Sequence, residues 1–207
     1  ISDWADALDE MLKLECGIFL PGHGFPILGK KRIEKALETT SKFLRSIEDQ
    51  TLKLMNQGKS LNQVLHEVEI PNDLMELPWL TPIYDDPQFL IRMIWRRYGG
   101  WWDGEYDRLL PAPRKEEALA WVELSNGIDN IILKALENLN KGNLKVAAQL
   151  IETAFYADND NDQMHDARAK IYREFSLKQS SSMGRNILNH ASMASAQGKR
   201  DLAQTEN

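Results

Sequence analysis

His23 stands in the segment of this sequence that is best suited to holding a reactive group. Residues 16–31 read CGIFLPGHGFPILGKK, so a short apolar run at residues 17–20 breaks into a turn with a glycine on each side of the imidazole. These glycines allow backbone angles that other residues avoid, and they let another group approach the ring. The pattern is typical of a buried strand that ends in a turn holding a metal ligand or a general base. A histidine whose ring is hydrogen-bonded within its own turn, with no catalytic or metal-binding role, fits the spacing equally well.

A second candidate site surrounds residues 98–104, YGGWWDG, which we call the aromatic turn. It follows a run with a helical pattern, residues 88–97, which carries Arg92, Arg96 and Arg97. Large aromatic rings beside glycines build the walls of pockets and interfaces, and they also fill ordinary cores. Both roles stay open for the tryptophans, whereas we expect Arg96 and Arg97 to lie on a solvated helix face.

Three alternating aspartates, Asp158, Asp160 and Asp162, invite comparison with a calcium-binding loop. The central glycine of that motif and its closing glutamate are both missing here. The sequence therefore does not favour a calcium site.

Composition limits the kinds of partner. The net charge of −6 comes without a long basic run, which argues against a nucleic-acid backbone as partner. No apolar stretch approaches the roughly 20 residues that span a bilayer. The single cysteine, Cys16, excludes an internal disulfide and leaves the compartment unknown. Because Ile1 already lies within a helical pattern, we expect the chain to be a piece of a longer protein.

The order of expected elements predicts a mainly α protein with a short α/β part. Helices are expected over residues 2–15, 30–56 and 61–68, with a lone strand at residues 17–20, a proline-rich connector, and then helices over residues 115–140, 144–156, 164–175 and 183–196. The stretch GNLKVAAQLIETAFYADNDNDQMHDARAKIY resembles a tetratricopeptide-type hairpin. Since one strand cannot form a sheet, we expect the loop around His23 to be poorly supported.

Two longer stretches resemble a known family. WADALDEMLKLECGIFLPGHGFPILGKKRIEKALETT is similar to the end of a metallo-β-lactamase-fold hydrolase, with its helix, strand, His loop and helix. QFLIRMIWRRYGGWWDGEYDRLLPAP resembles the segment that joins this fold to the helical dimerisation domain of the alkyl sulfatases. The resemblance covers nearly the whole chain. It implies the end of the catalytic fold over residues 1–69, a connector over 70–114, and an all-helical, tetratricopeptide-like dimerisation domain over 115–207.

Alkyl sulfatases of this type hydrolyse sulfate esters with two zinc ions, and well-known members are periplasmic or secreted homodimers. The resemblance implies that His23 is a ligand of the second metal and that Arg92 binds the sulfate oxygens. It also implies that Tyr98 and Trp102 line the substrate site. The chain would then be the C-terminal portion of a sulfate-ester hydrolase, supplying one metal-ligand loop, part of the pocket and the dimer interface.

The main metal motif of that family, His-x-His-x-Asp-His, is missing from this sequence. The four histidines, His23, His66, His165 and His190, are not spaced as metal ligands. Because one histidine cannot hold a catalytic zinc pair, we expect this chain alone to be inactive. The alternative function is a non-catalytic helical module that dimerises or binds a peptide.

Overall fold

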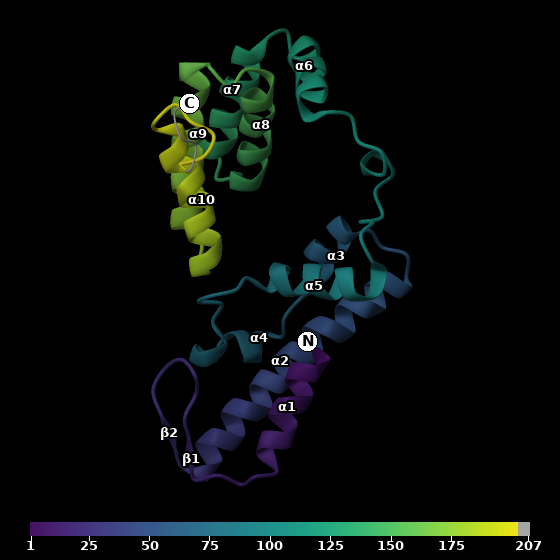
Figure 1. The fold of residues 1–207 in the computed structure, drawn as a ribbon, viewed down its shortest axis with the longest axis vertical. Helices are drawn as coiled ribbons and strands as arrows, with labels where there is room; N and C mark the ends of the chain where they lie inside the picture. The colour runs from purple at the N-terminus through teal and green to yellow at the C-terminus, as the bar shows by residue number, and fades with distance from the viewer. Residues whose placement is uncertain (203–207) are drawn as a thin grey trace. The chain divides into compact units, whose positions relative to one another are not determined.

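The computed structural model describes residues 1–202 (Figure 1) and is mainly helical, which confirms the predicted class. Contacts divide the chain into an N-terminal unit, Ile1–Leu109, and a C-terminal unit, Leu110–Asn207. Within the described residues, every helix is too short or too polar to cross a membrane.

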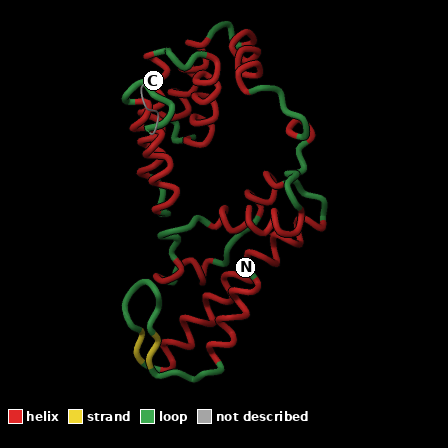
Figure 2. The backbone as a smooth tube through the Cα atoms, in the orientation of Figure 1, coloured by secondary structure: helices red, strands yellow, loops and turns green. Residues whose placement is uncertain are grey.

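The N-terminal unit has its only β-structure near its beginning, as Figure 2 shows for the described residues. Its elements are α1 (Ser2–Leu12), β1 (Ile18–Phe19), β2 (Ile27–Leu28), α2 (Lys30–Asn56), α3 (Leu61–Glu67), α4 (Asn72–Met75), the 3₁₀ helix η1 (Pro78–Leu80), α5 (Pro87–Gly99) and the 3₁₀ helix η2 (Tyr106–Arg108).

Helix α2 is the element against which α1, α3 and α5 pack. Ile33, Leu37, Leu44 and Ile47 recur at helical spacing along one side of α2, with Ser41 on the turn between Leu37 and Leu44, and all five are buried. An apolar residue at each turn gives a helix one buried stripe, and burial of that stripe stabilises the helix more than its intrinsic propensity does. The predicted bounds of this helix, residues 30–56, are confirmed.

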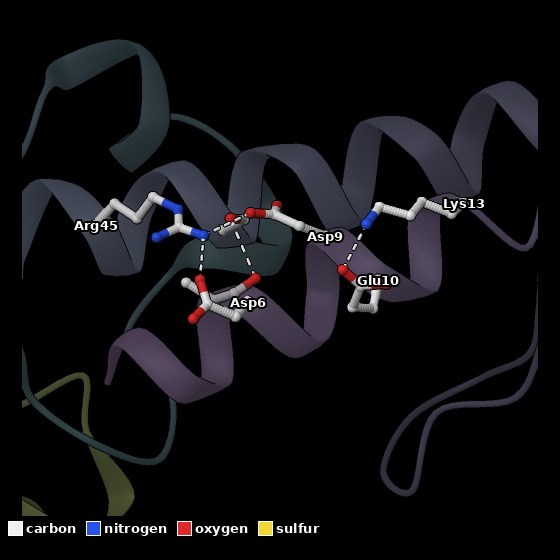
Figure 3. A network of polar contacts seen from close by, with 7 residues as sticks. Asp6, Asp9, Glu10, Lys13 and Arg45 are labelled. Carbon is white, nitrogen blue, oxygen red and sulfur yellow. Dashed lines mark hydrogen bonds and ion pairs between the residues drawn. The ribbon is translucent and has the colours of Figure 1, made fainter.

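One arginine joins α1 to α2 (Figure 3). Nη2 of Arg45 donates to Oδ1 of Asp6 at 2.6 Å and to Oδ2 of Asp9 at 2.5 Å. The hydrogen bond from Arg45 lowers the pKa of the Asp9 carboxyl below its ordinary value. Beneath these charges, Ala5 and Leu8 of α1 are buried. The pairing therefore fixes the rotation of α1 that brings its apolar side to α2.

The segment before His23 is not a buried strand, so that prediction is wrong. β1 pairs antiparallel with β2, with Ile18 opposite Leu28 and Phe19 opposite Ile27. Phe19 and Ile27 pack against the core of the unit, whereas Ile18 is 62% exposed. A two-stranded ribbon has two faces, and the described residues of the unit cover only one of them. The lone strand that the sequence predicts is thus one arm of a hairpin.

The C-terminal unit is entirely helical over its described residues. Its helices are α6 (Arg114–Leu124), α7 (Ile128–Asn140), α8 (Leu144–Ala157), α9 (Asp162–Leu177) and α10 (Ser182–Ser195). Each of α7, α8 and α9 packs against the next helix in sequence, and α6 packs against α8 (Figure 1).

The single long helix predicted over residues 115–140 is wrong, because the chain breaks between α6 and α7. Asn126 and Gly127 have positive φ angles of 58° and 122°, which a continuing right-handed helix cannot contain. The N–H of Gly127 returns to the carbonyl oxygen of Val122 at 2.9 Å, and Nδ2 of Asn130 donates to that of Ser125 at 2.8 Å. These bonds satisfy groups that the break would otherwise leave unpaired.

Arg168 of α9 ties α8 and α10 together from within the core, where it is only 6% exposed. Its Nε donates to Oε1 of Glu152 at 2.6 Å, and its Nη1 donates to Oγ of Ser195 at 2.7 Å and to the carbonyl oxygen of Ala191 at 3.2 Å. The guanidinium also lies 4.6 Å from the ring centroid of Phe155. A buried charge is tolerated when it is paired and hydrogen-bonded in this way.

His165 extends the same network. Its Nε2 lies 2.8 Å from the carbonyl oxygen of Asn159, and its Nδ1 lies 3.2 Å from Oγ of Ser195. Because a carbonyl oxygen only accepts, the tautomer that fits these contacts carries its proton on Nε2 and accepts from Ser195 at Nδ1. The Ser195 hydroxyl then accepts a hydrogen bond from Arg168 and donates one to His165, so each of these polar groups has a partner of the complementary kind.

Candidate functional site

His23 lies in the loop between β1 and β2, as the sequence predicts, with its side chain exposed. Gly24, which follows it, has a φ angle of 97°, a left-handed conformation that favours glycine. The N–H of Gly29 donates to the carbonyl oxygen of Gly17 at 2.9 Å and closes the base of the hairpin. The hairpin thus presents the imidazole away from the core of the unit.

Helix α5 positions the other predicted site residues. Asp86 caps it by accepting from the N–H of Gln88 at 2.8 Å, and Pro87 occupies its first turn. Ile91 and Trp95, one turn apart, are buried and fix the rotation of the helix. Arg92 is exposed as a result.

Tyr98, near the end of α5, is held by a buried carboxylate. Its hydroxyl donates to Oε1 of Glu48 at 2.9 Å, and Glu48, on α2, is only 5% exposed. One turn further along α2, the hydroxyl oxygen of Thr51 is buried without a hydrogen-bond partner among the described residues. The Tyr98 hydroxyl is therefore oriented toward α2 by a partner fifty residues away, which the sequence pattern did not indicate.

Trp102 lies in the aromatic turn and is fixed through its backbone. Its carbonyl oxygen accepts from Nε1 of Trp95 at 2.9 Å, and its ring meets that of Tyr106 edge to face with centroids 5.7 Å apart. The side chain itself stays partly exposed. Trp95 thus connects the core of the N-terminal unit to the aromatic turn.

Asp103 organises the rest of this turn. Its carboxylate accepts from the N–H of Glu105 at 3.0 Å and pairs with Nε of Arg108 at 3.0 Å. Its carbonyl oxygen accepts from the N–H of Leu61 at 2.8 Å, a group at the start of α3 that has no partner within that helix. The aromatic turn therefore caps α3 as well as presenting aromatic rings.

Gly104 approaches α3 so closely that we expect Gly104→Ala to destabilise the N-terminal unit by about 1–3 kcal/mol. Its φ angle is 85°, and a Cβ atom there would lie 3.0 Å from Cα of Ser60. Gly58→Ala is the matched control, because Gly58 has a φ angle of 77° but open space around it. Urea denaturation of both variants separates the two effects, since only Gly104→Ala adds a clash to the backbone strain. Equal losses would show that the contact with Ser60 carries no energy.

Within residues 1–202, no hydrogen bond or ion pair brings the four predicted site residues together. Tyr98 and Trp102 are joined through α5 and the aromatic turn, whereas no hydrogen bond or ion pair of the described residues links His23 or Arg92 to them. Among these residues, groups of three or more His, Cys, Asp or Glu side chains that could hold a metal ion are also absent. Because zinc takes three or four protein ligands, the residues present do not fit a zinc centre by themselves.

Comparison with known proteins places the chain in a family. Residues 60–198 match the alkyl sulfatase dimerisation family, and the chain therefore belongs to it. A linear primary-alkylsulfatase of Pseudomonas sp. is 29% identical over 171 residues, which is 82% of this chain and 32% of that relative. An alkyl/aryl-sulfatase of Saccharomyces cerevisiae is 26% identical over 201 residues, or 95% of this chain and 31% of the relative.

A solved structure has the same fold. The stereoselective inverting sec-alkylsulfatase Pisa1 from Pseudomonas sp. matches with a TM-score of 0.89 at 23% identity, over 95% of this chain and 32% of that chain. The chain thus spans about a third of the length of the relatives that it matches.

Proposed function

We propose that this chain is the C-terminal portion of a metal-dependent sulfate-ester hydrolase of the alkyl sulfatase type. The observation that carries the proposal is the family match over residues 60–198, because that range includes Arg92, Tyr98 and Trp102. Its support also includes the alkylsulfatase relatives, which extend well beyond the length of this chain.

In this proposal, α5 and the aromatic turn contribute to substrate binding. The exposed guanidinium of Arg92 binds the sulfate oxygens, a task for which a planar, permanently charged group with paired N–H donors is suited. Tyr98 and Trp102 offer partly exposed aromatic surface to the alkyl part of the ester. Glu48 acts as a positioning residue, since it holds the Tyr98 hydroxyl.

His23 contributes one metal ligand in the same proposal. The exposed imidazole at the tip of the hairpin is accessible to a metal whose remaining ligands come from elsewhere in a longer polypeptide. The family's cofactor would be two zinc ions, of which this chain alone supplies one ligand. His23 has no other role in this proposal.

The test uses the polypeptide that the upstream coding sequence and these residues encode together. We expect it to bind zinc and to hydrolyse hexyl sulfate, and we expect His23→Ala to lower its zinc content and to lower kcat/KM by about 100-fold or more. His66→Ala is the control, because His66 is an exposed histidine on α3 and neither property should change. The 207-residue chain alone should be inactive. Full zinc content and activity after His23→Ala would refute the role as a ligand.

We also propose that the chain forms a homodimer, in keeping with the family to which it belongs. Sedimentation equilibrium of the 207-residue chain tests this directly. A dimer from a longer polypeptide that lacks sulfatase activity would instead favour the alternative function, a non-catalytic helical module. The exposed apolar surface of the C-terminal unit, described next, is the observation that keeps this alternative open.

A further inference from the structure

The C-terminal unit contains a groove between α6, α7 and α8 with a volume of about 400 Å³, which we call the α6 groove. Ile131 and Leu150 line it, together with Val146 and the indole of Trp121. Lys134 also lines it and is exposed to solvent. The surface of the groove is therefore apolar, with a positive charge beside it.

Helix α6, which forms one wall, is apolar on more than one side. Ala118 is buried where α6 meets α8, yet Trp121 is 54% exposed and Leu124 is 74% exposed. A short helix with apolar residues outside its buried stripe exposes a surface that water solvates poorly, and such surfaces mark interaction sites. The groove and the exposed side of α6 lie next to each other, because Trp121 belongs to both.

We propose that the α6 groove receives the exposed side of α6 from a second copy of this chain, Leu124 included, with the two copies related by a two-fold axis. This inference rests on the proposed homodimer and names its contact surface. A two-fold interface must be complementary to itself, and α6 supplies both a wall of the groove and the apolar side chains that would fill it. Large aromatic side chains in central pockets are the residues that dominate interface energies.

The charges around the α6 groove of one copy are complementary to those on α6 of the other. Glu117 and Glu123 of α6 are exposed, and Lys134 of α7 lies beside the groove. Lys134 now pairs with Glu137, three residues along its own helix, at 2.8 Å. Exposed pairs of this kind are weak, so Lys134 can turn to an acidic residue of an arriving α6. A second copy therefore brings both the apolar and the acidic side chains that the groove requires.

Sedimentation equilibrium of variants of the 207-residue chain tests the contact. We expect Leu124→Glu to raise the Kd of the dimer by about 30-fold or more, because it places a charge in the apolar contact. Leu177→Glu is the matched control, since Leu177 is 65% exposed near the end of α9 and lies outside the groove, and it should leave Kd unchanged. Circular dichroism checks that both variants keep their helix content, which is expected because both positions are exposed.

Charge reversal gives a second, independent measurement. Glu123→Lys and Lys134→Glu should each weaken the dimer several-fold, and the double variant should restore much of the loss if the two residues meet across the interface. Two single losses that simply add would exclude that contact.

The outcomes separate the two proposals. If the unchanged chain is monomeric at every concentration, the homodimer is refuted and the α6 contact with it. If the unchanged chain is a dimer and Leu124→Glu dimerises equally well, the homodimer stands, the α6 contact is refuted, and the groove serves another occupant. A dimer that Leu124→Glu separates and Leu177→Glu does not is the result we expect.

Discussion

Arg168→Ala is expected to lower the free energy of unfolding of the C-terminal unit by about 3–5 kcal/mol. The substitution leaves the carboxylate of Glu152, which is largely buried, without the guanidinium that now lies 2.6 Å away. It also removes the donor to Ser195 and the cation above the ring of Phe155. Hydrogen exchange of α8, α9 and α10, followed by mass spectrometry in increasing urea, measures the loss where it occurs.

A double variant identifies the cause of that loss. Replacing Arg168 and Glu152 together with methionine removes both charges while keeping side-chain volume, so most of the stability lost in Arg168→Ala should return. Equal instability of the single and double variants would show that lost packing, and not an unpaired carboxylate, is responsible. A loss below about 1 kcal/mol in Arg168→Ala would contradict a role of the pair in stability.

Trp95→Ala is expected to destabilise the N-terminal unit by about 3–5 kcal/mol, because it empties a large space in the core between α2 and α5. It should also release the aromatic turn, since Nε1 of Trp95 donates to the carbonyl oxygen of Trp102. The amide of Leu61, which depends on the neighbouring carbonyl of Asp103, then exchanges faster with solvent. Urea denaturation measures the first effect, and hydrogen exchange at Leu61 measures the second.

Trp95→Phe separates packing from hydrogen bonding. Phenylalanine keeps much of the buried area but loses the indole donor and some volume, so we expect a hydrogen-bond part of about 1 kcal/mol in addition to a packing loss. The Leu61 amide should respond to both variants if the hydrogen bond holds the aromatic turn. Unchanged exchange at Leu61 in Trp95→Phe would show that packing alone holds it.

Local signals predicted the long and the well-capped elements. The apolar stripe of α2 and the glycine after it defined that helix. Ser60 directly precedes α3, and the structure shows a capping box in which the side chains of Ser60 and Gln63 each accept from the other residue's backbone N–H group. In each case the controlling interactions lie within a few residues of one another, so the sequence pattern contains them.

Two sequence predictions were wrong, the lone strand over residues 17–20 and the single helix over residues 115–140. The β2 strand has only two residues, too few for an alternating pattern, and its existence depends on pairing with β1. The break at Asn126 and Gly127 was missed because apolar residues continue with helical spacing on both sides of it. A Ser-Asn-Gly run within that pattern was the available signal.

The candidate site shows the same division. The sequence placed His23 in a loop, as the structure has it, but it placed Tyr98 after the helix over residues 88–97, whereas α5 continues through Tyr98 to Gly99. The roles of His23, Arg92, Tyr98 and Trp102 stay predictions. The partners that hold Tyr98 and Trp102, which are Glu48 and Trp95, come from packing of α2 against α5. Arg168 was missed because a charged residue on a helix is read as solvent-facing unless its distant partners are known.

Arg45 and Arg168, which each join helices in this chain, differ in how far they could be exchanged for lysine. Both contacts of Arg45 are made by a single nitrogen, Nη2, so the ammonium group of a lysine could in principle bridge Asp6 and Asp9 as a compact charge. Arg168 reaches Glu152 through Nε and Ser195 through Nη1, two donors in a rigid plane pointing in different directions. Homologous sequences should therefore carry either arginine or lysine at position 45. Position 168 should stay arginine wherever the acidic residue at position 152 is kept.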